Sequence, residues 1–238
     1  MKKLIKTALM LWRTWIRPDA AAKIVFYHDI GVENTPMGTP TELFWAHMAV
    51  LKHVGGGHRV AFDDGFRGIW TERENLKREG IRPLVFLPIR LIGMPGYLTW
   101  DEVLVLQNEY GVDFQCHTWS HQTLAGEYID ESPIEPRTEE WYKRELVEAK
   151  TELERRLGKS VTGLCFPAGM FSEDVVRRCR EAGYKKLYAS YPGNIPPEDE
   201  LIVPRNLVQD FGVSAFKLVL KGGMMAFEKR YRTAHFVR

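Results

Sequence analysis

Apolar residues along this chain alternate between short continuous runs and stripes with helical spacing. The continuous runs predict strands at 23–27, 59–62, 84–87, 113–116, 161–166 and 184–190, and a strand broken by Pro204 and Arg205 at 202–208. Apolar residues three and four positions apart predict helices at 41–54, 67–79, 99–110, 138–157 and 173–182. Thr99 is a good N-cap, and Gly158 follows the end of the longest helix. This alternation implies a parallel sheet, either open or closed into a barrel.

Residues 2–17 form a separate pattern. On a helix at about 100° per residue, one half is basic and the other half is apolar, and Pro18 stops the helix. Two interpretations remain open: the apolar face packs on the domain, or it lies in the plane of an anionic membrane surface. We expect a basic amphipathic helix at 1–18, which we interpret as an uncleaved segment, and one domain at 19–238.

Composition narrows the class of protein. The 238 residues are 45% apolar and 27% charged, as in an ordinary soluble domain. Residues 1–17 carry five basic and no acidic residues, which leaves 28 basic and 31 acidic residues in the remainder, a net charge of −3. Because this body is net acidic and carries no DNA- or RNA-binding module, we expect no nucleic-acid partner. Three cysteines cannot all pair, and we interpret them as free thiols in a reducing compartment.

Residues suited to catalysis follow the C-terminal ends of the predicted strands, where parallel barrels carry their active sites. They are His28, Asp63, Asp64, His117 and the segment 167–169. Adjacent carboxylates are costly unless a positive group lies beside them. His117 and His121, four positions apart, would project as two metal ligands from one side of a helical turn. One Asp and two His would leave a divalent ion with open coordination positions for water and substrate, as in the metal site of a hydrolase. The segment 127–137 is expected to be a loop at the same rim.

Two motifs carry a resemblance to a known family. Ala61-Phe62-Asp63-Asp64-Gly65 resembles the T-F-D-D-G motif, and His117-Thr118-Trp119-Ser120-His121 resembles the H-[ST]-x-x-H motif, of polysaccharide deacetylases, carbohydrate esterase family 4. Weaker similarities extend it over about residues 24–208, at 27–30, 98–100, 164–169 and 203–205. The resemblance implies an α/β fold, a single distorted (β/α) barrel of about seven strands, and a metal-dependent carbohydrate N-deacetylase.

The resemblance also assigns roles to residues. Asp64, His117 and His121 become ligands of one divalent ion; zinc suits this donor set best, and cobalt, nickel and ferrous iron are alternatives. Asp63 becomes the general base that accepts a proton from metal-bound water. Ala168, which follows Pro167, stands where the family has a tyrosine whose backbone N–H stabilises the oxyanion, so the amide is kept and the ring is lost.

Two assignments depend on departures from the family pattern. The family usually supplies the general acid from a histidine near the C-terminus, but His235 lies in a basic tail with no strand pattern around it. A circularly permuted branch places this histidine at the end of the first strand, where His28 stands, so we assign the acid to His28; a structural histidine is the alternative. The family's Arg before the P-Y loop is not recognisable. Trp100 is a candidate wall for a sugar ring, with buried packing as the alternative.

The functional hypothesis is removal of an N-acetyl, or another small acyl group, from an amino sugar of a glycan or glycan precursor. One alternative is hydrolysis of another C–N bond, in a formamide or a non-sugar amide. The other is a degenerate homologue that binds a glycan without turning it over. The thiols and the amphipathic N-terminus predict a cytoplasmic protein in peripheral contact with the inner membrane face.

Overall fold

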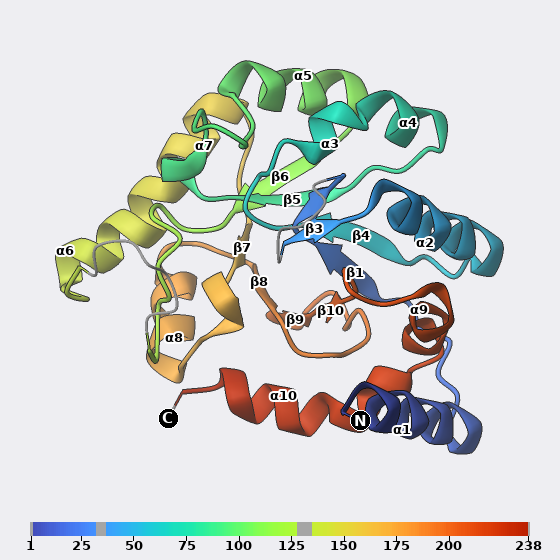
Figure 1. Ribbon diagram of the computed structural model, residues 1–238. Coiled ribbons are helices and arrows are strands. Elements are labelled where there is room, and N and C mark those ends of the chain that lie inside the picture. Colours follow the sequence, from blue (N-terminus) through green and yellow to red (C-terminus); the bar gives the residue numbers. More distant parts are fainter. Residues whose placement is uncertain (1, 32–36, 128–134, 238) are drawn as a thin grey trace.

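A computed structural model describes residues 2–31, 37–127 and 135–237, so the predicted rim loop at 127–137 lies largely outside the described residues. Parallel strands form one sheet that curls into a nearly closed barrel (Figure 1). Their order is β10 (Asn206–Leu207), β1 (Ile24–Tyr27), β4 (Arg59–Phe62), β5 (Leu84–Leu87), β6 (Asp113–Cys116), β7 (Gly163–Cys165), β8 (Lys186–Ala189) and β9 (Ile202–Pro204).

The sheet has eight strands where about seven were predicted. The difference lies at 202–208, which was expected to be one broken strand. It forms two short strands, β9 and β10, on opposite edges of the sheet, and Arg205 alone separates them in sequence. The seam of the barrel therefore lies at Arg205.

The barrel strands are buried on both faces, which explains their continuous apolar runs. Alternate side chains fill the interior, and the main ones are Ile24, Phe26, Ala61, Leu84, Phe86, Cys165, Tyr188 and Val203. The residues between them point outward and pack against the surrounding helices. Because the interior is filled by side chains, polar chemistry is confined to the rims of the barrel.

Three predicted helices form as expected: α2 (Thr41–Val54), α5 (Trp100–Tyr110) and α8 (Glu173–Glu181). Thr99 caps α5 in a capping box with Glu102. The helix predicted at 67–79 is two short helices, α3 (Gly68–Thr71) and α4 (Arg73–Arg78). The long helix predicted at 138–157 is α6 (Glu139–Tyr142), the π-helical turn η2 (Lys143–Glu148) and α7 (Ala149–Leu157).

Further short elements link these helices and strands. They are β2 (Asp29–Ile30), paired with β3 (Gly38–Thr39), and the 3₁₀ turns η1 (Ile89–Leu91) and η3 (Pro167–Gly169). The C-terminal part forms α9 (Val213–Leu220), the 3₁₀ turn η4 (Gly223–Phe227) and α10 (Glu228–His235). In Figure 1, α10 and the N-terminal helix α1 (Lys2–Ile16) lie along one side of the barrel.

Helix α1 packs on η4 and α9 through its basic half, not its apolar half. Met10, in the basic half, is 1% exposed, and Lys6 and Arg13, about one helical turn before and after it, are half-buried. The apolar half faces outward: Trp12 is 58% and Trp15 is 84% exposed. Packing of the apolar face on the domain is therefore wrong. None of the described helices is long and apolar enough to cross a membrane.

Candidate active site

The end of β4 delivers two carboxylates to the C-terminal rim of the barrel. The backbone N–H of Asp63 still donates to Tyr27 O, at 3.0 Å, in register with β1. The chain then turns through left-handed conformations at Asp64 (φ 71°) and Gly65 (φ 71°). A Cβ at Gly65 would lie 2.7 Å from Leu87 Cδ2, so this turn needs glycine. The two aspartates thus leave the strand in different directions.

The His117–His121 segment follows β6 and is an irregular loop, so the predicted helical turn is wrong. Thr118 and His121 both have φ 69°, which a helix does not allow. Buried Glu145, from the π-helical turn η2, holds the loop: its Oε2 accepts from the backbone N–H of Trp119 at 3.0 Å and of Ser120 at 2.8 Å. π-Helical turns are frequent at functional sites. Sequence reasoning missed Glu145.

Asp64, His117 and His121 converge on one point. The Nε2 atoms of His117 and His121 lie 3.3 and 2.9 Å from Asp64 Oδ1, and the three candidate ligand atoms lie within 4.8 Å of one another. Oδ1 is buried and accepts no hydrogen bond of acceptable geometry. Burial alone raises the pKa of Asp64, but the two imidazoles outweigh it and hold that pKa well below its usual value. This donor set fits a divalent ion.

The neighbours of His117 also favour Asp64, His117 and His121 as the metal ligands. Its Nδ1 lies 2.8 Å from Cys165 O, so Nδ1–H donates to that carbonyl and the Nε2 lone pair faces Asp64. Asp63, His117 and Cys165 form a second group of candidate metal ligands, which shares His117 with the first group. However, Arg205 occupies both oxygens of Asp63, and burial raises the pKa of the Cys165 thiol well above its usual value. The first group is the better metal site.

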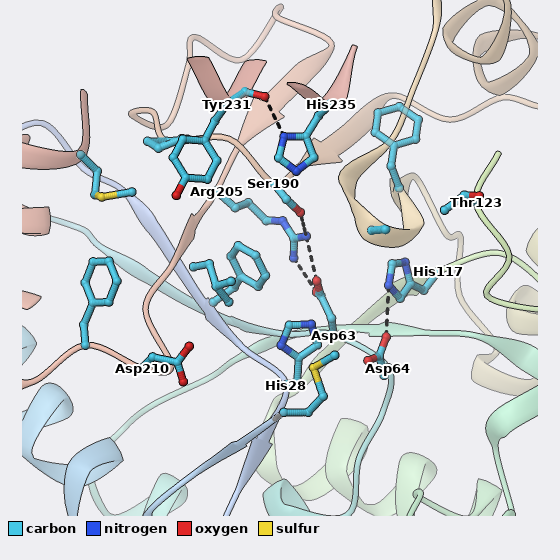
Figure 2. A pocket seen from close by; sticks show the side chains of 18 of the residues that line it. His28, Asp63, Asp64, His117, Thr123, Ser190, Arg205, Asp210, Tyr231 and His235 are labelled. Atoms are coloured by element: carbon cyan, nitrogen blue, oxygen red, sulfur yellow. Dashed lines mark hydrogen bonds and ion pairs between the residues drawn. The ribbon is translucent and has the colours of Figure 1, made fainter. Parts of the chain in front are cut away.

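Asp63 is held by an arginine that sequence reasoning did not assign. Arg205 Nη1 and Nη2 donate to Asp63 Oδ1 and Oδ2, at 2.5 and 2.9 Å (Figure 2). Arg205 reaches Asp63 from the seam of the barrel and stacks over Phe26, 4.2 Å from the ring centroid. Burial raises the pKa of Asp63, but the guanidinium outweighs it, so that pKa is lowered. The only signal in the sequence was the weak family similarity at 203–205.

His28 lies below Asp63 in Figure 2 and lines the same pocket. Its Nδ1 lies 2.6 Å from Gln209 Oε1, which leaves Nε2 for another partner. The next residue anchors this loop: Asp29 Oδ1 accepts from the backbone N–H of Ile30 and of Gly68, at 2.8 and 2.9 Å. His28 is therefore placed where a proton donor to a substrate could act.

His235 also reaches the pocket, although the sequence pattern placed it in a tail. It ends α10, and its Nδ1 lies 2.7 Å from Tyr231 O, one helical turn earlier (Figure 2). Its ring crowds the loop at Gly169, where an added Cβ would lie 2.8 Å from His235 Cδ2. Two histidines, His28 and His235, thus flank the carboxylates from distant parts of the chain.

The pocket at this rim has a volume of about 580 Å³. Its lining includes Ala168, the two aspartates Asp63 and Asp64, and the four histidines His28, His117, His121 and His235. Ala168 has φ 52°, and the preceding Pro167 is buried. Trp100 does not line the pocket: it begins α5, half-buried, with Arg156 over its ring at 5.0 Å. Trp100 is therefore not brought to the candidate site.

Backbone strain is concentrated at this pocket. The non-glycine residues with positive φ in the described ranges are Asp64, Thr118, His121 and Ala168. Each such conformation costs about 1–3 kcal/mol and persists only where the surrounding structure enforces it. All four belong to the loops that carry the candidate ligands and the candidate oxyanion donor.

A parallel β/α barrel with an Asp-His-His group beside a second carboxylate is the arrangement of a class of metal-dependent hydrolases. The family model for polysaccharide deacetylases matches residues 59–187. The chain belongs to the polysaccharide deacetylase family. It is a carbohydrate deacetylase, a hydrolase, and metal dependence is typical of this family.

The individual proteins to which the chain is similar share 23% or less of their sequence with it. A curated Bacillus subtilis (strain 168) protein, YxkH, which carries the polysaccharide deacetylase name, is 23% identical over 204 residues, covering 75% of this chain and 68% of YxkH. The structure of IcaB from Ammonifex degensii superposes with a TM-score of 0.73 at 16% identity, over 87% of this chain and 98% of IcaB. Streptococcus pyogenes deacetylase PplD gives 0.71 at 16% identity, over 85% and 99%. These two likenesses show the fold.

Proposed function

We propose that this deacetylase holds one divalent ion, zinc by preference, on Asp64, His117 and His121, and removes an N-acetyl or other small acyl group from an amino sugar of a glycan or glycan precursor. The observation that carries the proposal is the meeting of three ligand atoms within 4.8 Å beside the ionised carboxylate of Asp63. Two imidazoles and one carboxylate suit zinc, with cobalt, nickel or ferrous iron as alternatives.

The chain's own residues supply the proton transfers. When bound, the ion would lower the pKa of a water molecule and polarise the acyl carbonyl. The Asp63 carboxylate, kept ionised and oriented by Arg205, would accept a proton from the attacking water. The Ala168 backbone N–H donates to the oxygen on which negative charge develops. His28, held at Nδ1 by Gln209, donates a proton from Nε2 to the departing amine nitrogen.

Metal content is the first test of this proposal. Elemental mass spectrometry of native protein purified without chelators is expected to find about one zinc or similar ion per chain. His117→Ala should lose the ion, whereas His53→Ala, which changes an exposed histidine of α2, should keep it. Native protein that holds no metal after reconstitution would overturn the proposed site.

A substrate screen identifies the acyl group that is removed and tests the two alternative functions. N-acetyl sugars, N-formyl sugars and simple amides share the chemistry at the carbonyl, so relative kcat/KM decides among them. Preference for a simple amide over both sugars would favour the other C–N hydrolase. Asp63→Asn should keep the metal and lose about 10²–10⁴-fold in kcat, because general base catalysis contributes that much. No turnover by metal-loaded protein that still binds glycan would favour the non-catalytic homologue.

We also propose that the chain works in the cytoplasm, in peripheral contact with the inner membrane face through residues 1–17. The free, buried thiols of all three cysteines support a reducing compartment. The outward apolar face of α1, with Trp12 and Trp15 exposed, supports contact with lipid. Sedimentation with anionic vesicles should fall for Trp12→Gln/Trp15→Gln. Equal sedimentation of the variant and the native chain would overturn the membrane contact.

A further inference from the structure

Helix α1 forms part of the wall of the deacetylase pocket as well as an exposed apolar surface. Lys6, on the inward half of α1, lines the pocket together with Phe211, Met224 and Tyr231. Its Nζ lies 4.7 Å from the centroid of the Phe211 ring and 3.5 Å from Tyr231 Oη. The N-terminal helix therefore places one half-buried cation at the same pocket as the candidate catalytic residues.

This cation is separated from the candidate metal ligands. Figure 2 shows Tyr231, the partner of Lys6, on one side of the pocket and His117 with Asp64 on the other, with Asp63 and His28 between them. Asp210 lines the pocket on the Tyr231 side and is exposed. Among the described residues, no carboxylate lies within 4.0 Å of Lys6 Nζ. Lys6 Nζ contacts the Phe211 and Tyr231 rings and the Tyr231 hydroxyl, none of which carries a full negative charge, so Lys6 is able to bind an anion.

The orientation of α1 links this cation to the membrane proposed above. Lys6 points inward with Met10, while Trp12 and Trp15 point outward. If the outward face lies in the lipid interface, Lys6 stands between that interface and the acyl-hydrolysis site. In a lipid-linked sugar, the charged phosphate likewise stands between the lipid and the sugar. The order of groups along the helix and pocket thus matches the order of groups in such a substrate.

We propose, on the basis of the proposed deacetylase function, that the substrate is an N-acylated amino sugar carrying a phosphate. The phosphate lies against Lys6 Nζ and Tyr231 Oη, and the acyl group lies between Asp63 and the candidate metal ligands. The phosphate source is a lipid-linked sugar that enters the pocket at the membrane surface. A soluble sugar phosphate offers the same chemistry to Lys6 and is distinguished below.

The phosphate site is tested with two soluble probes, N-acetylglucosamine 1-phosphate and the methyl glycoside of N-acetylglucosamine. The metal-loaded chain should show a KM about 10-fold lower for the phosphate, as expected of a charge-assisted hydrogen bond. Lys6→Met should remove this advantage and Lys6→Arg should restore most of it. Lys229→Met, which removes the same charge from an exposed position of α10, should retain the advantage.

The outcomes of this experiment separate the two proposals. Hydrolysis of neither probe, nor of any other N-acyl sugar, means that the proposed deacetylase function fails. Hydrolysis of both with equal KM, or a phosphate advantage that Lys6→Met leaves intact, overturns the phosphate site while the deacetylase stands.

The source of the phosphate is tested with a prenyl-phosphate-linked N-acetylglucosamine embedded in anionic vesicles. Trp12→Gln/Trp15→Gln changes only exposed residues of α1. The double variant should lose about 10-fold or more in rate on the embedded substrate, because burial of the two aromatic side chains is lost, and should hydrolyse soluble N-acetylglucosamine 1-phosphate at the native rate. Equal rates of native and variant chains on the embedded substrate overturn the lipid-linked source.

Discussion

Arg205 and Asp63 form a bidentate ion pair in which the side chains are 0% and 5% exposed. The arginine comes from the seam between β9 and β10, and the aspartate comes from the end of β4. Closure of the barrel therefore places a permanent positive charge beside the candidate general base. The same contact ties the seam to the end of β4, so we expect both stability and activity to depend on it.

Loss of Arg205 is expected to affect both properties. Arg205→Met leaves the buried Asp63 carboxylate without its guanidinium partner, which costs about 3–5 kcal/mol of unfolding free energy. The kcat should fall as well, because the base is no longer oriented. Urea denaturation and a deacetylase assay measure the two effects. Arg177→Met, which breaks exposed ion pairs on α8, should change stability by less than about 1 kcal/mol. Equal effects of the two substitutions would contradict the assigned role of Arg205.

Glu145 is expected to tune metal affinity without touching the metal. Its Oε2 holds the Trp119 and Ser120 amides, and so fixes the loop that carries His117 and His121. Glu145→Gln should weaken metal binding by about 10–100-fold, as for other groups that orient ligands. Competition with a chromogenic chelator measures the affinity. Glu148→Gln, an exposed neighbour in the same π-helical turn, is the control and should bind metal normally. Unchanged affinity in Glu145→Gln would remove it from the site.

His28 is expected to be the general acid. His28→Gln should lower kcat on an N-acetyl sugar by about 10²–10⁴-fold. The loss should be much smaller on an aryl acetate, whose leaving group needs no proton. His235→Gln changes the other histidine that flanks the carboxylates and should give a smaller loss on both substrates. A large loss specific to the amide in His235→Gln, with His28→Gln near native, would transfer the role to His235.

Gly68 is expected to be essential for the loop that carries His28. A Cβ at Gly68 would lie 2.2 Å from Asp29 Oδ1 and 2.4 Å from Ile30 O, so Gly68→Ala must displace the Asp29 anchor. We expect a loss of about 2 kcal/mol or more in stability, together with lower activity. Gly212→Ala, where no atom lies within 4 Å of the new Cβ, is the matched control for thermal unfolding. If both variants melt alike, the anchor is not needed.

Much of the candidate site could be predicted from the sequence because it depends on local order along the chain. Asp63, Asp64 and His117 each follow an apolar run, and parallel strands bring their carboxyl ends to one rim. The number of barrel strands was underestimated where one broken segment serves both edges of the sheet. The loop conformation of His117–His121 could not be predicted, because a spacing of four residues is common to helices and to loops of this kind.

The partners of these residues were decided by the tertiary structure. Arg205 is 142 residues from Asp63, and Glu145 is 25 residues from Ser120. His235 reaches the pocket on α10, a helix that no sequence pattern predicted. Contacts of this kind leave little trace in local spacing, because they depend on where separate elements meet after the barrel has closed.

Helix α1 shows most clearly which features the sequence determines and which depend on the tertiary structure. The sequence by itself determined that residues 2–17 form a helix with one basic and one apolar half. It could not determine which half faces the barrel, because amphipathicity is a property of one helix, whereas packing is a property of two surfaces. Only the tertiary structure placed Met10 inward and Trp15 outward. The physical reason is that the free energy of packing depends on both partners, and η4 and α9 contact the half of α1 that carries Met10.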